Sequence, residues 1–385
     1  MHSSPPCHLY GRWQDVLLLG GASVFAFIAC RLVDWTPDKV GLLAALMLVL
    51  AHFVNHPHFA HSYQLFYSQI RQRVEAASGS IEKKKLLVIA FVIPAVLATL
   101  LLYGAIEWRT GNRFPMGLMI NLMGALVGWH YVKQGFGMAM TDAALKRTYW
   151  SSTARRALLF NAYLCWVLTW LYLNASAVGT QFWGIFYARM SVPMPLVFIT
   201  AGLTLLSTLC TGVLVHRDFR QHRATGVAYA HLPWAGLVGY TVSLYLWTVF
   251  ASVDPAYLLV IPFFHSVQYL TVVYRCKWHE TGRGLGTAAS HWSLVRFVLL
   301  GLVLGWLGFW AVPGYLDFSR IEWMWAPTSV PALAIACFWL FINVHHYFID
   351  NVLWRSTNPY VKIHLFGATS SATSIPSRSA GLVVR

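Results

Sequence analysis

Apolar stretches of about 20 residues recur along almost the whole chain, and they constrain its fold more than any other feature. Because a helix satisfies its own backbone hydrogen bonds in lipid, stretches of this length predict membrane-spanning helices. The chain therefore predicts an all-α fold, a polytopic membrane bundle with about ten transmembrane helices. The ten expected spans are residues 14–32, 40–56, 86–107, 114–138, 157–175, 193–215, 232–252, 255–274, 294–313 and 329–353.

The composition excludes an ordinary soluble protein. Hydrophobic residues make up 57% of the 385 residues and charged residues only 11%, whereas a soluble domain carries roughly a quarter charged residues. The mean hydropathy is +0.55. Six cysteines are scattered without a Cys-x-x-Cys pair, so neither a disulfide framework nor a thiolate metal site is expected. We interpret residues 1–356 as a single integral-membrane helical domain and residues 357–385, which are rich in serine, as a disordered cytoplasmic tail.

The basic residues predict the orientation of the bundle. There are 28 Lys and Arg against 13 Asp and Glu, and in a membrane protein such an excess is typical of cytoplasmic loops. With ten spans and both termini inside, 22 of the 28 basic residues fall on the cytoplasmic side. We therefore expect no nucleic-acid partner, and a multi-pass protein of a bacterial inner membrane with both ends in the cytoplasm.

The histidines are the strongest functional signal. Four clusters, at residues 52–61, 130, 265 and 345–346, lie toward the ends of predicted spans that all run from outside to inside. The clusters should share one depth near the cytoplasmic face, and ionisable residues in spans usually face a polar interior. We interpret the other histidines as interfacial: His2, His8, His216, His222, His231, His279, His291 and His364.

The spacing within these clusters predicts a metal site. His52 with His56, and His346 with Asp350, are four residues apart and so share a helix face. Pro57 breaks the helix and would redirect His58 toward the same centre. Imidazoles with one carboxylate suit iron, zinc or copper rather than magnesium or calcium. The predicted metal ligands are His52, His56, His58, His130, His265, His345, His346 and Asp350.

Three further polar side chains accompany the predicted ligands. Gln134 follows His130 by four residues, and Tyr269 follows His265 by four, so each is expected on its histidine's face. Asn343 precedes the His345–His346 pair. We assign these three residues to supporting or binding the cofactor and assign no residue a catalytic role. The number of ligands exceeds what one tetrahedral zinc requires, which favours two metal ions, or one metal ion with many supporting residues around its ligands. From the residues alone, iron, zinc and copper all remain open.

This arrangement resembles the histidine-rich integral-membrane non-haem iron oxygenases and desaturases, including the bacterial carotenoid-cleaving dioxygenases. His52-x-x-x-His56 matches the first histidine box of the desaturases, while Asn343-Val-His345-His346 only partly matches their later His-x-x-His-His boxes. The resemblance implies one or two non-haem iron atoms as the cofactor, with zinc or copper as the alternatives. It also implies an oxidoreductase that uses O₂ on a lipophilic small molecule in the bilayer. No flavin or haem-attachment motif is present, so a separate electron-donor protein is expected where electrons are needed.

Three other functions remain open from the residues alone. His265-x-x-x-Tyr269 followed by His345-His346 also resembles the copper ligands of haem–copper oxidases. A transporter or proton-coupled protein could use the same buried histidines with Asp350. An acyl- or glycosyltransferase could combine a catalytic histidine with Asn343.

Overall fold

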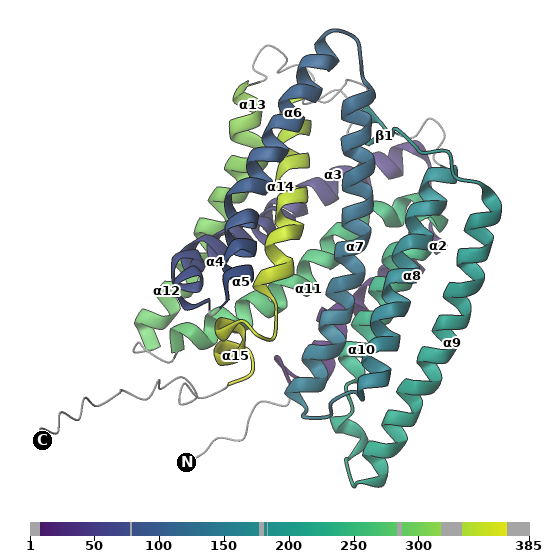
Figure 1. Cartoon of the computed structure of the whole chain (residues 1–385), viewed down its shortest axis with the longest axis vertical. Helices are drawn as coiled ribbons and strands as arrows, with labels where there is room; N and C mark the ends of the chain where they lie inside the picture. The colour runs from purple at the N-terminus through teal and green to yellow at the C-terminus, as the bar shows by residue number, and fades with distance from the viewer. Residues whose placement is uncertain are drawn as a thin grey trace, which may run out of the picture.

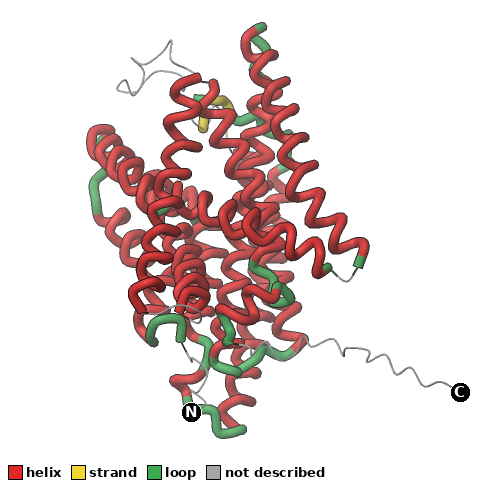
Figure 2. The backbone as a smooth tube through the Cα atoms, turned by 90° about the vertical axis from the view of Figure 1, so that its left-hand side faces the viewer, coloured by secondary structure: helices red, strands yellow, loops and turns green. Residues whose placement is uncertain are grey.

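The computed structural model describes residues 8–77, 79–176, 181–182, 184–282, 287–316 and 333–367. Nearly all of this chain is helical, as Figures 1 and 2 show, and the longest helices lie side by side in a bundle. The prediction of an all-α membrane bundle is therefore confirmed at this level.

Within the described residues, eight helical stretches are long and apolar enough to cross a membrane. Several consist of two or three helical segments joined end to end. They are α1–η1–α2 (Arg12–Val16, Leu17–Gly21 and Ala22–Leu32), α3–α4 (Pro37–Phe53 and Asn55–Ala76), α5–η2–α6 (Ser80–Leu87, Val88–Val92 and Ile93–Arg109), α8 (Ser152–Ser176), α9 (Met194–Ala224), α11 (Pro255–Gly282), α12–η6–α13 (Thr287–Trp306, Leu307–Ala311 and Val312–Leu316) and α14 (Leu333–Leu353).

Two more helices occupy the remaining predicted spans. The long helix α7 (Phe114–Leu145) covers the fourth, and α10 (Trp234–Thr241) with the π-helical segment η4 (Val242–Val249) covers the seventh. Each of the ten predicted ranges thus coincides with helix, although residues 329–332 lie outside the described residues. The short elements are η3 (Tyr229–His231), η5 (Ala251–Val253), α15 (Pro359–His364) and a two-stranded antiparallel ladder of β1 (Gln181–Phe182) and β2 (Ile185–Phe186).

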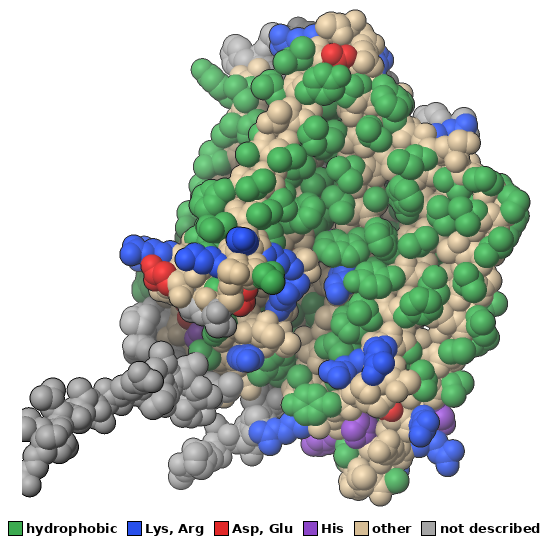
Figure 3. All heavy atoms as spheres, viewed as in Figure 1, with side chains coloured by type: hydrophobic (Ala, Val, Ile, Leu, Met, Phe, Trp, Pro, Cys, Tyr) green, Lys and Arg blue, Asp and Glu red, His purple; other side chains and the backbone are tan. Residues whose placement is uncertain are grey.

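The outer surface of the bundle is apolar. Leu42, Phe198 and Val213 are 73%, 69% and 69% exposed, although burial of such side chains from water is the main driving force for folding. Figure 3 shows green apolar side chains over most of the upper and middle part of the molecule, with blue Lys and Arg more numerous in its lower half than at its top. This surface is suited to lipid.

The interior is built around α7, which packs against α6, α8, α10 and α14. Close approach to α10 depends on Gly236, where an added Cβ would lie 2.6 Å from the Met138 carbonyl oxygen. The Gly236 backbone N–H also donates to Asp142 Oδ2 at 2.8 Å. Asp142 accepts from Lys146 as well, at 2.9 Å for the nearer oxygen, so this buried carboxylate is paired. These contacts fix α10 against the C-terminal half of α7.

The first and last described segments pack together at one end of the bundle. Leu9 and Leu19 share a core cluster with Val361 and Leu365, each no more than 3% exposed. Within the segment from residue 357 that was expected to be a disordered tail, Pro359–His364 form α15, because Val361 and Leu365 pack into this core cluster. Residues 368–385 lie outside the described residues.

Candidate metal centre

Four buried side chains from three helices converge in the interior. They are His58 on α4, His130 on α7, and His346 and Asp350 on α14. One ligand atom from each lies within 4.8 Å of the others, and each residue is at most 7% exposed. His346 and Asp350 share a face of α14 because they are four residues apart. Imidazole and carboxylate are common metal ligands, so this group could hold a metal ion.

A helix break positions His58 within the group. The α3 helix ends at Phe53, and Val54 has φ −125° and ψ −57°, outside helical values. The chain then starts α4 in a new direction, with Pro57 in the first turn, where a missing N–H costs nothing. The break thus lies three residues before the proline. His58 directly follows Pro57, in the part of α4 that packs against α11 and α14.

Every member of the group has a buried polar atom without a hydrogen-bond partner. Among the described residues these atoms include His58 Nε2, His130 Nε2, both ring nitrogens of His346, and Asp350 Oδ2. Asp350 Oδ2 lies 3.2 Å from His346 Nε2 and 3.8 Å from His130 Nε2, but without hydrogen-bond geometry. An unpaired buried polar atom costs about 1–3 kcal/mol. Several such atoms facing one point fit a bound cation.

The remaining carboxylate oxygen of Asp350 and the remaining ring nitrogen of His58 form hydrogen bonds, and these hydrogen bonds orient the two side chains. Asp350 Oδ1 accepts from Ser62 Oγ and from the Tyr269 hydroxyl, both at 3.1 Å. The Ser266 hydroxyl donates to Asn55 Oδ1 at 2.8 Å, so its oxygen accepts from His58 Nδ1 at 3.2 Å. That bond places the proton on Nδ1 and leaves the lone pair of Nε2 facing the group. Such outer contacts commonly fix the tautomer and orientation of metal ligands.

His265 on α11 lies directly beside the group. Its ring centroid is 5.0 Å from that of His58 and 5.0 Å from that of His130. The side chain is 3% exposed, and its Nδ1 has no hydrogen-bond partner in the described part of the chain. His265 is not one of the four residues whose ligand atoms lie within 4.8 Å of one another, but it is placed to contact an ion or a molecule bound there.

The structure does not bring His52, His56 or His345 into the group. His52 stacks on Trp310 at 5.6 Å between ring centroids, and His56 stacks on Phe309 at 4.3 Å. Both therefore face α12 and η6. His345 donates from Nε2 to the Ile89 carbonyl at 2.9 Å and accepts at Nδ1 from the Tyr63 hydroxyl at 3.0 Å. Both of its ring nitrogens thus have partners that a metal would displace.

The three predicted supporting residues have different surroundings. Tyr269 contacts Asp350 directly, as described above. Gln134 donates to the His265 carbonyl at 3.2 Å and to Gln268 Oε1 at 2.7 Å, so it holds α7 against α11 beside the group. Asn343 accepts from the Tyr347 hydroxyl at 3.2 Å, and the Tyr347 ring stacks on His130 at 4.7 Å. Asn343 therefore acts on the group only through Tyr347.

Sequence reasoning missed Ser62, Ser266 and Tyr347. Ser62 follows His58 by four residues, and Tyr347 is next to His346, so helical spacing could have identified the first. Ser266 is adjacent to His265, and no pattern connects it with His58, which is 208 residues away. Of the histidines interpreted as interfacial, His2 lies outside the described residues, and the other seven are exposed or half-buried.

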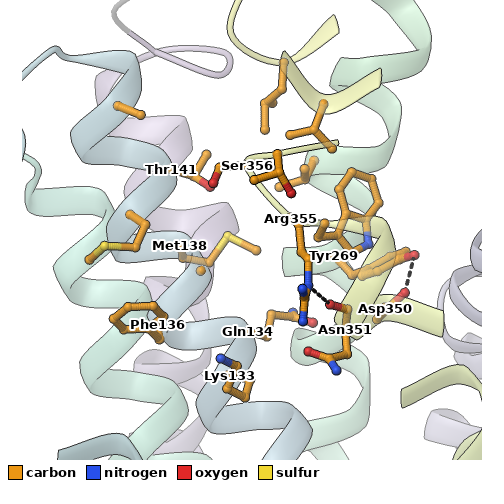
Figure 4. A pocket seen from close by; sticks show the side chains of 18 of the residues that line it. Lys133, Gln134, Phe136, Met138, Thr141, Tyr269, Asp350, Asn351, Arg355 and Ser356 are labelled. Atoms are coloured by element: carbon orange, nitrogen blue, oxygen red, sulfur yellow. Dashed lines mark hydrogen bonds between the residues drawn. The ribbon is translucent and has the colours of Figure 1, made fainter. Parts of the chain in front are cut away.

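A cavity of about 780 Å³ reaches the group from the side. It lies between α7, α11, α14 and α15, and His130, Tyr269 and Asp350 form part of its wall. Figure 4 shows this wall, with the Tyr269 hydroxyl bonded to Asp350 at one side of the cavity. Small-molecule sites have volumes of roughly 300–1,000 Å³. A molecule of that size could therefore reach His130 and Asp350, the two members of the group in the cavity wall.

Comparison of the chain with protein-family models, with curated proteins and with solved structures finds no match.

Proposed function

We propose that this chain is an integral-membrane metalloenzyme in which His58, His130, His346 and Asp350 hold a non-haem iron ion, and that it oxidises a lipophilic molecule with O₂. The convergence of four buried ligand atoms within 4.8 Å is the observation that carries the proposal. Iron held by histidines and a carboxylate, with positions left open, supports oxygen chemistry. His265 and the cavity beside the group favour such an open centre over a closed structural site.

The protein's own side chains would prepare this centre in three ways. Ser62 and Tyr269 hold one oxygen of Asp350 and leave the other directed at the group. Ser266 fixes the tautomer of His58. The rings of Tyr131 and Tyr347 pack on His265 and His130, at 4.3 and 4.7 Å between centroids, and keep water from this side of the group.

The remaining parts of the proposal concern the surroundings of the centre. The apolar outer surface supports a substrate delivered from the bilayer. The excess of Lys and Arg near the end of the bundle that carries the cavity supports a cytoplasmic position. A separate protein would then supply electrons from the cytoplasm, and the membrane would be a bacterial inner membrane.

The test is metal analysis of the purified protein. We expect one iron per chain without haem absorbance, and O₂ consumption that depends on iron and on an added reductant and lipid extract. Zinc or copper at the same stoichiometry would identify one of the alternative metals and refute the iron assignment. Protein that binds no metal above the level of a His130→Ala and Asp350→Ala double variant would refute the centre itself.

A further inference from the structure

The cavity beside the metal group carries an unbalanced positive charge. Three basic side chains line it. Lys133 lies on α7, Arg147 follows the end of α7, and Arg355 follows the end of α14. Within the part of the chain that the structure describes, Asp350 is the only acidic side chain in the wall, and it belongs to the metal group. Among the described residues, none of the three cations forms an ion pair with an acidic side chain. The cavity therefore has a net attraction for anions.

Two of these cations lie near one another beside the group. Figure 4 shows Arg355 extending from the α14 side toward Gln134 and Lys133 on α7. The charges of Lys133 and Arg355 repel each other. Lys133 is three residues from His130 on the same helix, or about 4.5 Å along its axis. An anion bound between the two cations would relieve their repulsion and would lie about one helical turn from the metal ligands.

Both cations are held by contacts that leave their charge available. The Arg355 Nε donates to the Asn351 carbonyl at 2.9 Å. The two terminal nitrogens of the guanidinium form no hydrogen bond to any described residue, and they have the geometry for a bidentate anion. The Lys133 ammonium lies over the rings of Phe136 and Tyr163, 5.6 and 5.8 Å from their centroids. These contacts fix the direction of each side chain without neutralising it.

The rest of the cavity wall is largely apolar. Met138, Val272, Trp354, Val361, Leu365 and Phe366 all contribute to it. A free inorganic anion would leave this surface in contact with water, whereas a hydrocarbon chain would cover it. The wall thus combines a cationic pair near the metal group with an apolar surface that a hydrocarbon chain could cover.

We propose that this cavity binds a single-chain amphiphile with an anionic headgroup, such as a long-chain carboxylate, and holds the headgroup between Lys133 and Arg355. That this amphiphile is the substrate rests on the proposed function, whereas its binding does not. With the headgroup held there, the carbon atoms next to it, rather than the far end of the chain, lie nearest to His130 and Asp350.

Binding of oleate, oleyl alcohol and acetate to the protein in nanodiscs tests this proposal. Oleate should bind more tightly than the uncharged alcohol by about 10- to 100-fold, which is the range for charge-assisted hydrogen bonds. Acetate should bind far more weakly than oleate, because it covers none of the apolar wall. Any of three results would overturn the proposal. Oleate could bind no more tightly than oleyl alcohol, it could bind no more tightly than acetate, or it could fail to bind.

Variants locate the headgroup. Lys133→Gln combined with Arg355→Gln should remove the preference for oleate over the alcohol, while Arg355→Lys should keep most of it. The matched control is Lys84→Gln with Arg156→Gln, two exposed basic residues outside the cavity wall, which should bind like the wild type. An unchanged preference in the first double variant would refute the assignment of the cationic pair.

Metal content separates this proposal from the proposed function. The Lys133 and Arg355 variants should retain wild-type metal per chain, because neither residue belongs to the group of four. Oleate selectivity in protein that binds no metal would uphold the amphiphile site and refute the metalloenzyme. Metal binding without oleate selectivity would do the reverse.

Discussion

The adjacent histidines of α14 allow the metal centre to be tested with a matched pair of variants. His346 and His345 are both buried and next to each other in the chain. His346 offers a ligand atom to the group, whereas His345 is bonded to Tyr63 and Ile89. Replacing either one by alanine removes the same volume from the same helix. We expect His346→Ala to lose metal and His345→Ala to retain it.

The size of the effect follows from what each side chain contacts. A four-ligand metal site contributes about 10–16 kcal/mol of binding energy in small zinc domains, so one ligand of four accounts for about 2.5–4 kcal/mol. His346→Ala should therefore weaken metal binding by roughly 100- to 1,000-fold. His345→Ala removes two hydrogen bonds, each with a net value of about 0.5–1.5 kcal/mol. It should lower stability by about 1–3 kcal/mol with or without metal.

Chelator should reverse the order of stability of the two variants. Without metal, both ring nitrogens of His346 are buried and have no hydrogen-bond partner among the described residues. Replacing His346 by alanine therefore removes the free-energy penalty of two unpaired polar atoms, whereas the nitrogens of His345 are hydrogen-bonded and have no such penalty. Thermal unfolding in detergent should find His346→Ala the less stable variant with metal and the more stable variant with chelator. Metal per chain should be measured on the same samples.

Two results would refute this reasoning. If both variants retained wild-type metal content, α14 would not supply a ligand through His346. If His345→Ala lost metal as completely as His346→Ala, then the contacts of His345 with Tyr63 and Ile89 would not describe the metal-bound protein.

Three further predictions concern the surroundings of the centre and the orientation of the bundle. Tyr269→Phe should weaken metal binding by about 10- to 100-fold, since it removes one of the bonds that orient the carboxylate ligand, and unchanged affinity in a metal titration would contradict that role. Gly236→Ala should lower the detergent melting temperature through overpacking of about 1–3 kcal/mol, whereas Gly212→Ala, with nothing within 4 Å of the added Cβ, should not, and equal effects would refute the close approach of α10 to α7. Single cysteines at Lys84 and Lys39, both exposed, should react with a membrane-impermeant reagent from the cytoplasmic and the opposite side respectively, and labelling from one common side would refute the predicted orientation.

Local spacing in the sequence was sufficient to predict the fold class and part of the metal group. Apolar runs of span length coincide with helices because a chain in lipid must satisfy its backbone within each segment. His346 and Asp350 were correctly placed on one face, because four-residue spacing within an unbroken helix fixes that geometry. The convergence of His58 and His130 with them was predicted from their shared depth.

The same reasoning could not separate the ligands from their neighbours. His52 and His56 do share a face, with 4.9 Å between their ring centroids, but this face is turned toward η6 and not toward the group, and nothing in the residue spacing shows that direction. Which of His345 and His346 points inward depends on the packing of Tyr63 and Ile89 against α14. The supporting contact from Ser266 joins positions 208 residues apart. Long-range packing decides such features, and a single sequence does not display it.

The positions of the ligands along the chain determine when the metal centre can be completed during synthesis. Its first member lies on α4 and its last on α14, and Ser62 is separated from its partner Asp350 by 288 residues. No nascent chain that stops before α14 contains more than two of the four side chains. An ion held by all four side chains would therefore enter only after α14 has been made and has packed against α4 and α7. A ribosome-associated chain can be helical and membrane-embedded, but it does not yet have the complete ligand set, so a supply of metal would act on the finished protein and not on its insertion.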